Sequence, residues 1–150
     1  MATTVYLDAC CVSRPFDDQR QVRVRFEAEA VLFILARVCA NEWAWVASEA
    51  LDQEISENPN ADTRGPALTL LRHAQRWVAV GSAEVARACT LQGSGLGGYD
   101  ALHVACAEAG GVDVLLTTDD RLVRAAGRLK AGIRVTIANP LDWLRKTVQQ

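Results

Sequence analysis

The fold of this chain is decided by one continuous stretch, Tyr99-Asp-Ala-Leu-His-Val-Ala-Cys-Ala-Glu-Ala-Gly-Gly-Val-Asp-Val-Leu-Leu-Thr-Thr-Asp119. Its first part predicts a helix over Tyr99–Ala109, which the glycine pair Gly110-Gly111 ends. Val112–Leu116 is the most strand-like run in the chain and predicts a buried strand, which two threonines and Asp119 close. A helix that leads directly into a buried strand is typical of a parallel sheet covered by helices.

Strands and helices alternate in the same way along the rest of the chain. We predict strands over Val5–Leu7, Trp43–Ala47, Trp77–Val80, Val112–Leu116 and Arg134–Ala138. The other helices are expected over Gln21–Ala40, from a Ser48 cap to about Asn58, over Arg64–Arg76, from a Ser82 cap to about Gln92, over Asp120–Lys130, and from Pro140 through Leu144. Turns or loops are expected over Ser13–Asp18, Asn58–Thr63 and Gly93–Gly98. The fold class is therefore α/β, a three-layer α/β/α sandwich around a central, mostly parallel, five-stranded sheet.

Composition limits the class of protein further. The chain has 150 residues, of which 50% are hydrophobic, and this suits one compact domain over residues 1–150. Its five cysteines are scattered without a C-x-x-C pair, as expected for reduced thiols. We see no secretory signal, and the most apolar stretch, Ala30–Ala36, is too short to span a bilayer. We therefore expect a cytoplasmic protein without a membrane partner.

The net charge of -2 offers no general attraction to nucleic acid. Binding to RNA would therefore need local basic patches or metal ions. Two groups of arginines are candidates for such patches, although each group could also be the solvated face of an ordinary surface element. They are Arg20, Arg23 and Arg25, and then Arg121, Arg124 and Arg128, whose spacing places them on one helix face.

Four acids stand where a parallel sheet would gather them. Asp8 and Asp119 follow strands, Asp100 lies in the first turn of a helix, and Glu54 lies on the helix after the second strand. Four carboxylates on one rim repel each other unless a cation offsets their charge, and oxygen ligands favour Mg²⁺ or Mn²⁺. Each acid also has a structural explanation, since Asp119 would cap a helix, Asp100 would favour a helix start and Glu54 would be solvated. Asp8 is the hardest of the four to explain in this way.

These segments resemble the PIN domain family over almost the whole chain. Tyr99–Asp119 is similar to the second-half signature of that family, and Val5–Asp8 is similar to its opening strand and first acid. Glu54 stands where the family places a helical glutamate, with Glu49 and Asp52 as nearby competitors. The resemblance implies an endoribonuclease that uses Mg²⁺ or Mn²⁺ to activate water for attack on the phosphodiester.

The resemblance also implies roles for the site residues. Asp8, Asp100 and Asp119 would be the principal metal ligands, and Glu54 would be a ligand or a base acting through water. Thr117 or Thr118 would orient a ligand or water. Cys10 stands where the family commonly has a small hydroxyl or amide residue that orders the site.

Partners follow from the resemblance as well. The chain would be the toxin of a type II toxin–antitoxin pair, with RNA as its substrate. A small VapB-type antitoxin would lie across the groove with a basic side chain on the acids, and the protein would form a homodimer. The segment Ser13–Asp18 marks a sub-branch of the family whose members are not all toxins.

Two other functions compete with the nuclease. A non-catalytic PIN-type module would bind RNA or protein through a vestigial site. A phosphatase would use Asp8 as a covalent nucleophile, but it would want a second acid where Cys10 stands.

Three further features have an ordinary structural explanation beside a functional one. Gly93, Gly95 and Gly98 match G-x-G-x-x-G but follow a helix, so a loop is the better interpretation. His103 follows Asp100 by one turn and is expected to be a packing histidine, although it would lie near the site. The adjacent Cys10 and Cys11 suggest either a redox switch or ordinary buried thiols.

Overall fold

The central sheet of the protein is wholly parallel. The computed structural model describes residues 2–129 and 132–148. Five strands form one sheet in the order β3-β2-β1-β4-β5, with every neighbouring pair parallel. Their bounds are β1 Thr3–Leu7, β2 Trp43–Ser48, β3 Arg76–Val78, β4 Val114–Leu116 and β5 Thr136–Ala138. The predicted α/β class and sheet are thereby confirmed.

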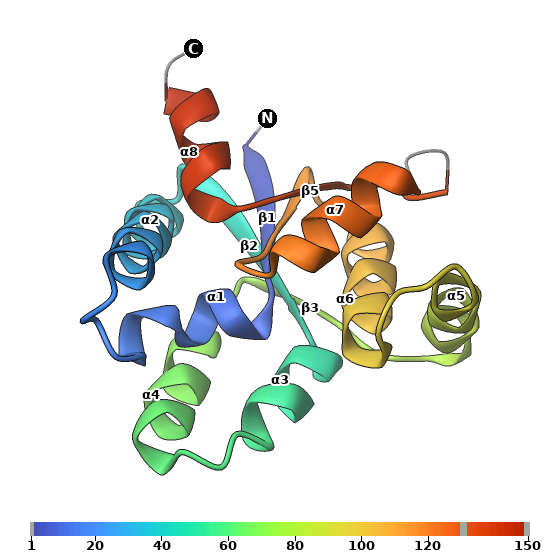
Figure 1. The fold of residues 1–150 in the computed structure, drawn as a ribbon, viewed down its shortest axis with the longest axis horizontal. Coiled ribbons are helices and arrows are strands. Elements are labelled where there is room, and N and C mark those ends of the chain that lie inside the picture. The colour runs from blue at the N-terminus through green and yellow to red at the C-terminus, as the bar shows by residue number, and fades with distance from the viewer. Residues whose placement is uncertain (1, 130–131, 149–150) are drawn as a thin grey trace.

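Helices cover both faces of this sheet. They are α1 Ala9–Ser13, the 3₁₀ turn η1 Arg14–Phe16, α2 Val22–Cys39, α3 Glu49–Ser56, α4 Ala61–Leu71, α5 Ser82–Gly93, α6 Gly98–Ala109, α7 Asp120–Arg128 and α8 Pro140–Val148. Figure 1 shows α2 and α8 on one side of the strands and α5 and α6 on the other, as in a three-layer sandwich. None of the described helices combines the length and the apolarity needed to cross a membrane.

The first half of the chain departs from prediction in two places. The stretch before Asp17 is helical rather than a turn, because Asp8 caps α1 and Pro15 favours the start of η1. Helix α4 begins at Ala61 rather than at Arg64, because the side chain of Asn60 accepts the amide of Asp62.

Boundaries in the second half shift for similar local reasons. Arg76 belongs to β3, not to α4, and this strand ends at Val78. The cap of α5 is Gly81 rather than Ser82, because Glu84 Oε1 accepts the Gly81 amide at 2.8 Å. The expected glycine loop is shortened at both ends, because Gly93 ends α5 and Gly98 begins α6. Strand β5 begins at Thr136, and the predicted helix end at Lys130 lies outside the described residues.

The strand β1 occupies the middle of the sheet. Val5, Tyr6 and Leu7 are fully buried, as expected for a parallel strand covered on both faces. Leu7 pairs with Leu116 in β4, so the two strands end side by side. Whatever follows Leu7 and Leu116 in the sequence therefore meets at one place, the carboxyl edge of the sheet.

Candidate metal centre

Asp8 is the most buried acid at the carboxyl edge. Its side chain follows β1, and the residue is only 4% exposed. Asp8 Oδ1 accepts the amide of Cys11 at 3.1 Å, which caps α1, and the Cys10 thiol donates to the same oxygen at 2.7 Å. Burial raises the pKa of Asp8 well above its ordinary value. The negative charge at this position is therefore poorly compensated by the protein alone.

The loop after β4 brings Thr117 and Thr118 to Cys10, which adjoins Asp8, and then continues to Asp119. Thr117 Oγ1 accepts the amide of Asp119 at 3.0 Å and lies 3.6 Å from Cys10 Sγ. The Thr118 amide donates to Cys10 Sγ at 3.3 Å. Asp119 caps α7 by accepting the amide of Arg121 at 2.9 Å. Asp119 therefore has the helix-capping role that its position predicted, and this cap also fixes its carboxylate at the edge of the sheet.

Asp100 lies in the first turn of α6 and shares a pocket with Asp119. This pocket has a volume of about 530 Å³, and Arg121, Arg124 and Arg128 also line it. Burial raises the pKa of Asp100, and the nearby charges of Asp119 and Glu54 raise it further. Three acids therefore share one electrostatic neighbourhood.

Glu54 reaches this neighbourhood through His103. Its Oε1 lies 2.6 Å from His103 Nε2, and His103 Nδ1 lies 2.7 Å from the Tyr6 hydroxyl, which contacts Ser48 Oγ at 2.7 Å. An ionised carboxylate only accepts, so Nε2 donates to Glu54. With a neutral imidazole, Nδ1 then accepts from Tyr6, and Tyr6 accepts from Ser48. Ser48 in turn accepts the amide of Leu51 at the start of α3. This relay holds Glu54 in place, whereas the competing acids of α3, Glu49 and Asp52, are exposed.

His103 is both a packing residue and a site residue. It is 1% exposed, as the packing interpretation requires, and its hydrogen bond to Glu54 adds a functional contact. The signal in the sequence was its spacing from Asp100, because residues three apart share a helix face. No sequence signal pointed to Tyr6 or Ser48 as its partners, since these lie on strands far away in the chain.

A buried carboxylate that sequence reasoning missed supports the loop after β4. Glu27 in α2 is 1% exposed, and its oxygens lie 3.3 Å from Arg14 Nε and 3.1 Å from Arg23 Nε, while Asn139 Nδ2 donates to it at 2.7 Å. Arg14 also donates to Thr118 Oγ1 at 2.7 Å. The Glu27 network therefore links α2, η1 and α8 to the segment that carries Asp119.

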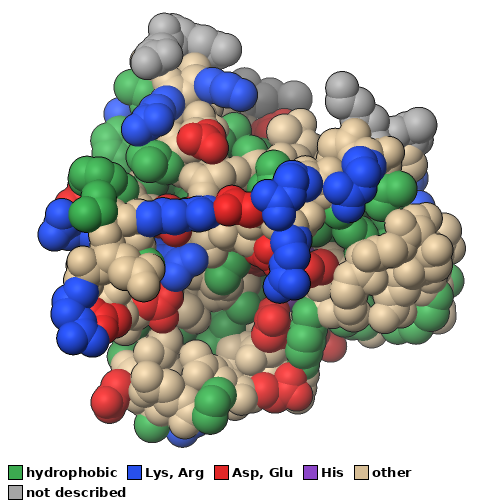
Figure 2. Space-filling model, viewed as in Figure 1, with side chains coloured by type: hydrophobic (Ala, Val, Ile, Leu, Met, Phe, Trp, Pro, Cys, Tyr) green, Lys and Arg blue, Asp and Glu red, His purple; other side chains and the backbone are tan. Residues whose placement is uncertain are grey.

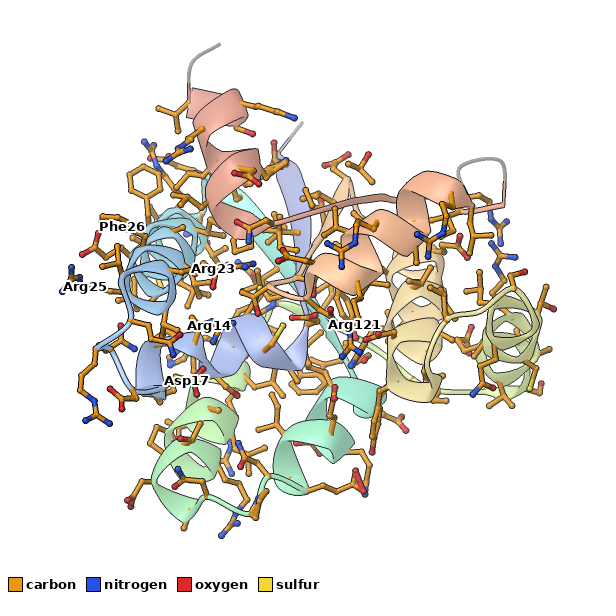
Figure 3. All side chains as sticks on the ribbon, in the orientation of Figure 1. Arg14, Asp17, Arg23, Arg25, Phe26 and Arg121 are labelled. Atoms are coloured by element: carbon orange, nitrogen blue, oxygen red, sulfur yellow. The ribbon has the colours of Figure 1, made fainter. Side chains whose placement is uncertain are left out.

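The first predicted basic patch is largely neutralised by this packing. Figure 3 shows Arg14 and Arg23 directed toward the middle of the molecule, whereas Arg25 lies on the outer side of α2. Arg23 pairs with Asp120 at 2.7 Å, and Arg20 pairs with Asp18. The second predicted group, on α7, lies together along the pocket of Asp100 and Asp119. Figure 2 shows acidic side chains in the middle of this face, with basic side chains beside them.

The four predicted acids are neighbours rather than a tight cluster. Within residues 2–129 and 132–148, the one group of three candidate ligands with donor atoms within 4.8 Å of one another is Asp8, Cys10 and Cys11. Asp100 and Asp119 line the pocket, and Glu54 approaches from α3. The arrangement offers oxygen donors from four elements around one edge of the sheet.

Comparison with known proteins gives the family. The model of the PIN domain matches residues 5–128. Among solved structures, a chain of VapBC2 from Rickettsia felis, bound to a DNA fragment from their promoter, superposes with a TM-score of 0.59 at 12% sequence identity, covering 91% of this chain and 98% of that one. No curated protein sequence matches at a significant level. Because the family model spans most of its length, the chain belongs to the PIN domain family.

Proposed function

We propose that this protein is an endoribonuclease that depends on Mg²⁺ or Mn²⁺, and that residues 1–150 act as one nuclease domain. The observation that carries the proposal is that two acids at the carboxyl edge of the sheet, Asp8 and Asp100, are in surroundings that disfavour their negative charge. The pKa of Asp8 is raised by burial, and the pKa of Asp100 is raised by burial and by Asp119. A divalent cation among these carboxylates would offset their charge, and oxygen donors suit Mg²⁺ or Mn²⁺.

The residues of the site would divide the work. Asp8, Asp100 and Asp119 would hold the metal, with Asp8 and Asp119 fixed by the helices that they cap. When bound, the metal would supply charge to stabilise the phosphate and lower the pKa of a water. Glu54 would be a further ligand or would accept the proton of the attacking water, since His103 holds its carboxylate toward the site. Thr117 and Thr118 would orient the loop and the water.

Phosphate binding would fall to the arginines of α7. Arg121, Arg124 and Arg128 line the same pocket as Asp100 and Asp119. Arginine presents a rigid fork of donors that matches phosphate oxygens. The phosphates beside the cleaved bond would lie along these side chains, which would compensate for the acidic net charge of the chain.

A toxin role with protein partners completes the proposal. The similar solved structure contains VapBC2 bound to promoter DNA. We propose that a VapB-type antitoxin binds this chain and covers its pocket with a basic side chain. A second copy would pack on α2, where Phe26 is 45% and Leu32 is 51% exposed. The cytoplasmic location stays a prediction from the sequence.

Cleavage of a labelled, structured RNA tests the catalytic proposal. Wild type with Mg²⁺ or Mn²⁺ is expected to cut, and EDTA or the substitution Asp100→Asn is expected to abolish cutting. Asp52→Asn is the matched control, because Asp52 is an exposed acid on α3. Circular dichroism and thermal melts must show all variants folded. If the folded wild type cuts no RNA of a broad panel, a binding module takes the place of the nuclease. If Asp100→Asn cuts equally well, the cutting does not come from the proposed site and the catalytic assignment fails.

A further inference from the structure

Cys10 places a sulfur atom inside the proposed metal site. Its thiol lies in the first turn of α1 and donates to Asp8 Oδ1 at 2.7 Å. The Thr118 amide donates to the sulfur at 3.3 Å, and Thr117 Oγ1 lies 3.6 Å away from it. Cys10 is half-buried, so the residue is partly enclosed by the site and keeps some exposure to solvent. A soft donor therefore stands among the hard oxygens that Mg²⁺ prefers.

A second sulfur lies behind the first. Cys11 is fully buried, and its thiol donates to the Leu116 carbonyl at 3.3 Å. Donor atoms of Asp8, Cys10 and Cys11 all lie within 4.8 Å of one another. A tetrahedral zinc ion with bonds of about 2.3 Å to sulfur and about 2.1 Å to oxygen holds those two ligands roughly 3.6 Å apart. The separation of Asp8 and Cys10 needs to open by only about 1 Å to admit such an ion.

We propose that Asp8 and Cys10, with Cys11 as a third donor, form a binding site for a thiophilic divalent cation such as Zn²⁺ or Cd²⁺. On binding, the Cys10 sulfur forms a bond to the cation, and its thiol proton leaves to solvent. Asp8 contributes a carboxylate oxygen to the same ion. The same Oδ1 can bind the ion and keep the hydrogen bond from the Cys11 amide that caps α1, because a carboxylate oxygen has two lone pairs.

The consequence for regulation rests on the proposed function. Asp8 cannot serve a thiophilic cation and a catalytic Mg²⁺ in the same way at once. Divalent zinc also binds mixed donor sets more tightly than Mn²⁺ does, and thiolate ligands widen that preference. Zn²⁺ or Cd²⁺ therefore takes Asp8 out of the catalytic arrangement and inhibits cleavage, and Cys10 is the residue that makes the enzyme sensitive to them.

Cadmium chloride alone is the probe for binding. The protein is prepared reduced in a background where the exposed Cys39 and Cys89 are serine, so that these two thiols do not contribute. Titration is expected to give the ultraviolet charge-transfer band of a cadmium–thiolate bond, with one ion bound for each chain. Cys10→Ser should lose most of the band and weaken Cd²⁺ binding at least about tenfold. Cys106→Ser is the control for a buried thiol that lies outside the cluster.

Measuring Cd²⁺ binding and RNA cleavage separately distinguishes failure of the proposed metal site from failure of the proposed nuclease function. If the band and the affinity are the same with and without Cys10, or if the parent background binds no Cd²⁺, the site is refuted whatever the nuclease does. If Cd²⁺ binds through Cys10 but no RNA is cut with Mg²⁺ or Mn²⁺, the site stands and the proposed function fails. Where RNA is cut, the ratio of activity with and without Cd²⁺ should drop for the parent and change much less for Cys10→Ser. An equal drop in both proteins contradicts the regulatory role.

Discussion

Replacing Glu27 by glutamine tests whether the Glu27 network supports the fold. The side chain of Glu27 is 2% exposed and that of Arg14 is 20% exposed, so their ion pair is mostly buried. Breaking such a pair by removing one charge typically costs about 3–5 kcal/mol, because the other charge stays behind without its partner. The substitution Glu27→Gln keeps the shape of the side chain and removes only its charge.

Two features of the network reduce that figure. Arg23 is 54% exposed, so water solvates its charge when Glu27 is neutral. Both arginines also keep another acid, Asp17 for Arg14 and Asp120 for Arg23. We therefore expect Glu27→Gln to lower the free energy of unfolding by about 2–3 kcal/mol. In a chain of this size, that loss corresponds to a melting temperature lower by about 4–12 °C.

Urea unfolding followed by tryptophan fluorescence measures this effect. The midpoint should fall while the slope of the transition stays constant, which marks a change in stability rather than in compactness. Glu29→Gln is the matched control, since Glu29 is exposed on the same helix. If the two variants unfold within about 0.5 kcal/mol of each other, the buried charge does not stabilise this fold and the argument is wrong.

Three other predictions follow from the site. Arg124→Gln should weaken RNA binding, and the slope of log K against the logarithm of salt concentration should become shallower by roughly one unit. Binding titrations at several salt concentrations measure this slope, and an unchanged slope would mean that Arg124 does not contact the RNA. His103→Leu should lower kcat and alter the pH profile of cleavage more than it changes KM, because Glu54 loses its donor, whereas an unchanged profile would make His103 a packing residue only. The raised pKa of Asp100 favours its protonated form in the folded state. In EDTA, the free energy of unfolding of wild type, compared with that of Asp100→Asn, should therefore fall as pH rises from the ordinary aspartate pKa of 3.8 toward neutrality. Urea melts across that range measure it, Mg²⁺ should reverse the fall, and a rise in EDTA would contradict the electrostatic argument.

Local patterns in the sequence predicted the sheet and the acids that follow its strands. Buried parallel strands are short apolar runs, and Val5–Leu7 and Val114–Leu116 have this character whatever their partners are. The class of fold then places Asp8 and Asp119 at the same edge. Their hydrogen bonds at the starts of α1 and α7 are consistent with that placement.

Contacts between distant segments could not be predicted in this way. The helix α1 has only five residues, too few for a periodic pattern, and depends on its Asp8 cap and on packing against neighbouring helices. Arg14 meets Thr118 across 104 residues of sequence, and Tyr6 meets His103 across 97. Nothing in one sequence marks these residues as partners, so the supports of Glu54 and of the loop after β4 appear only in three dimensions.

The central position of β1 has a consequence for synthesis of the protein on the ribosome. Its residues leave the ribosome long before those of β4, yet Thr4 accepts and donates hydrogen bonds with Asp113, which is made 109 residues later. Sheets built from such distant segments fold slowly, because the chain loses the entropy of closing a long loop before the strands make their stabilising contacts. When β4 of a nascent chain has not yet emerged from the ribosome, Asp8 has emerged but Asp119 has not. The two acids can meet only after the segment up to Asp119 has emerged, so a shorter nascent chain carries no assembled site.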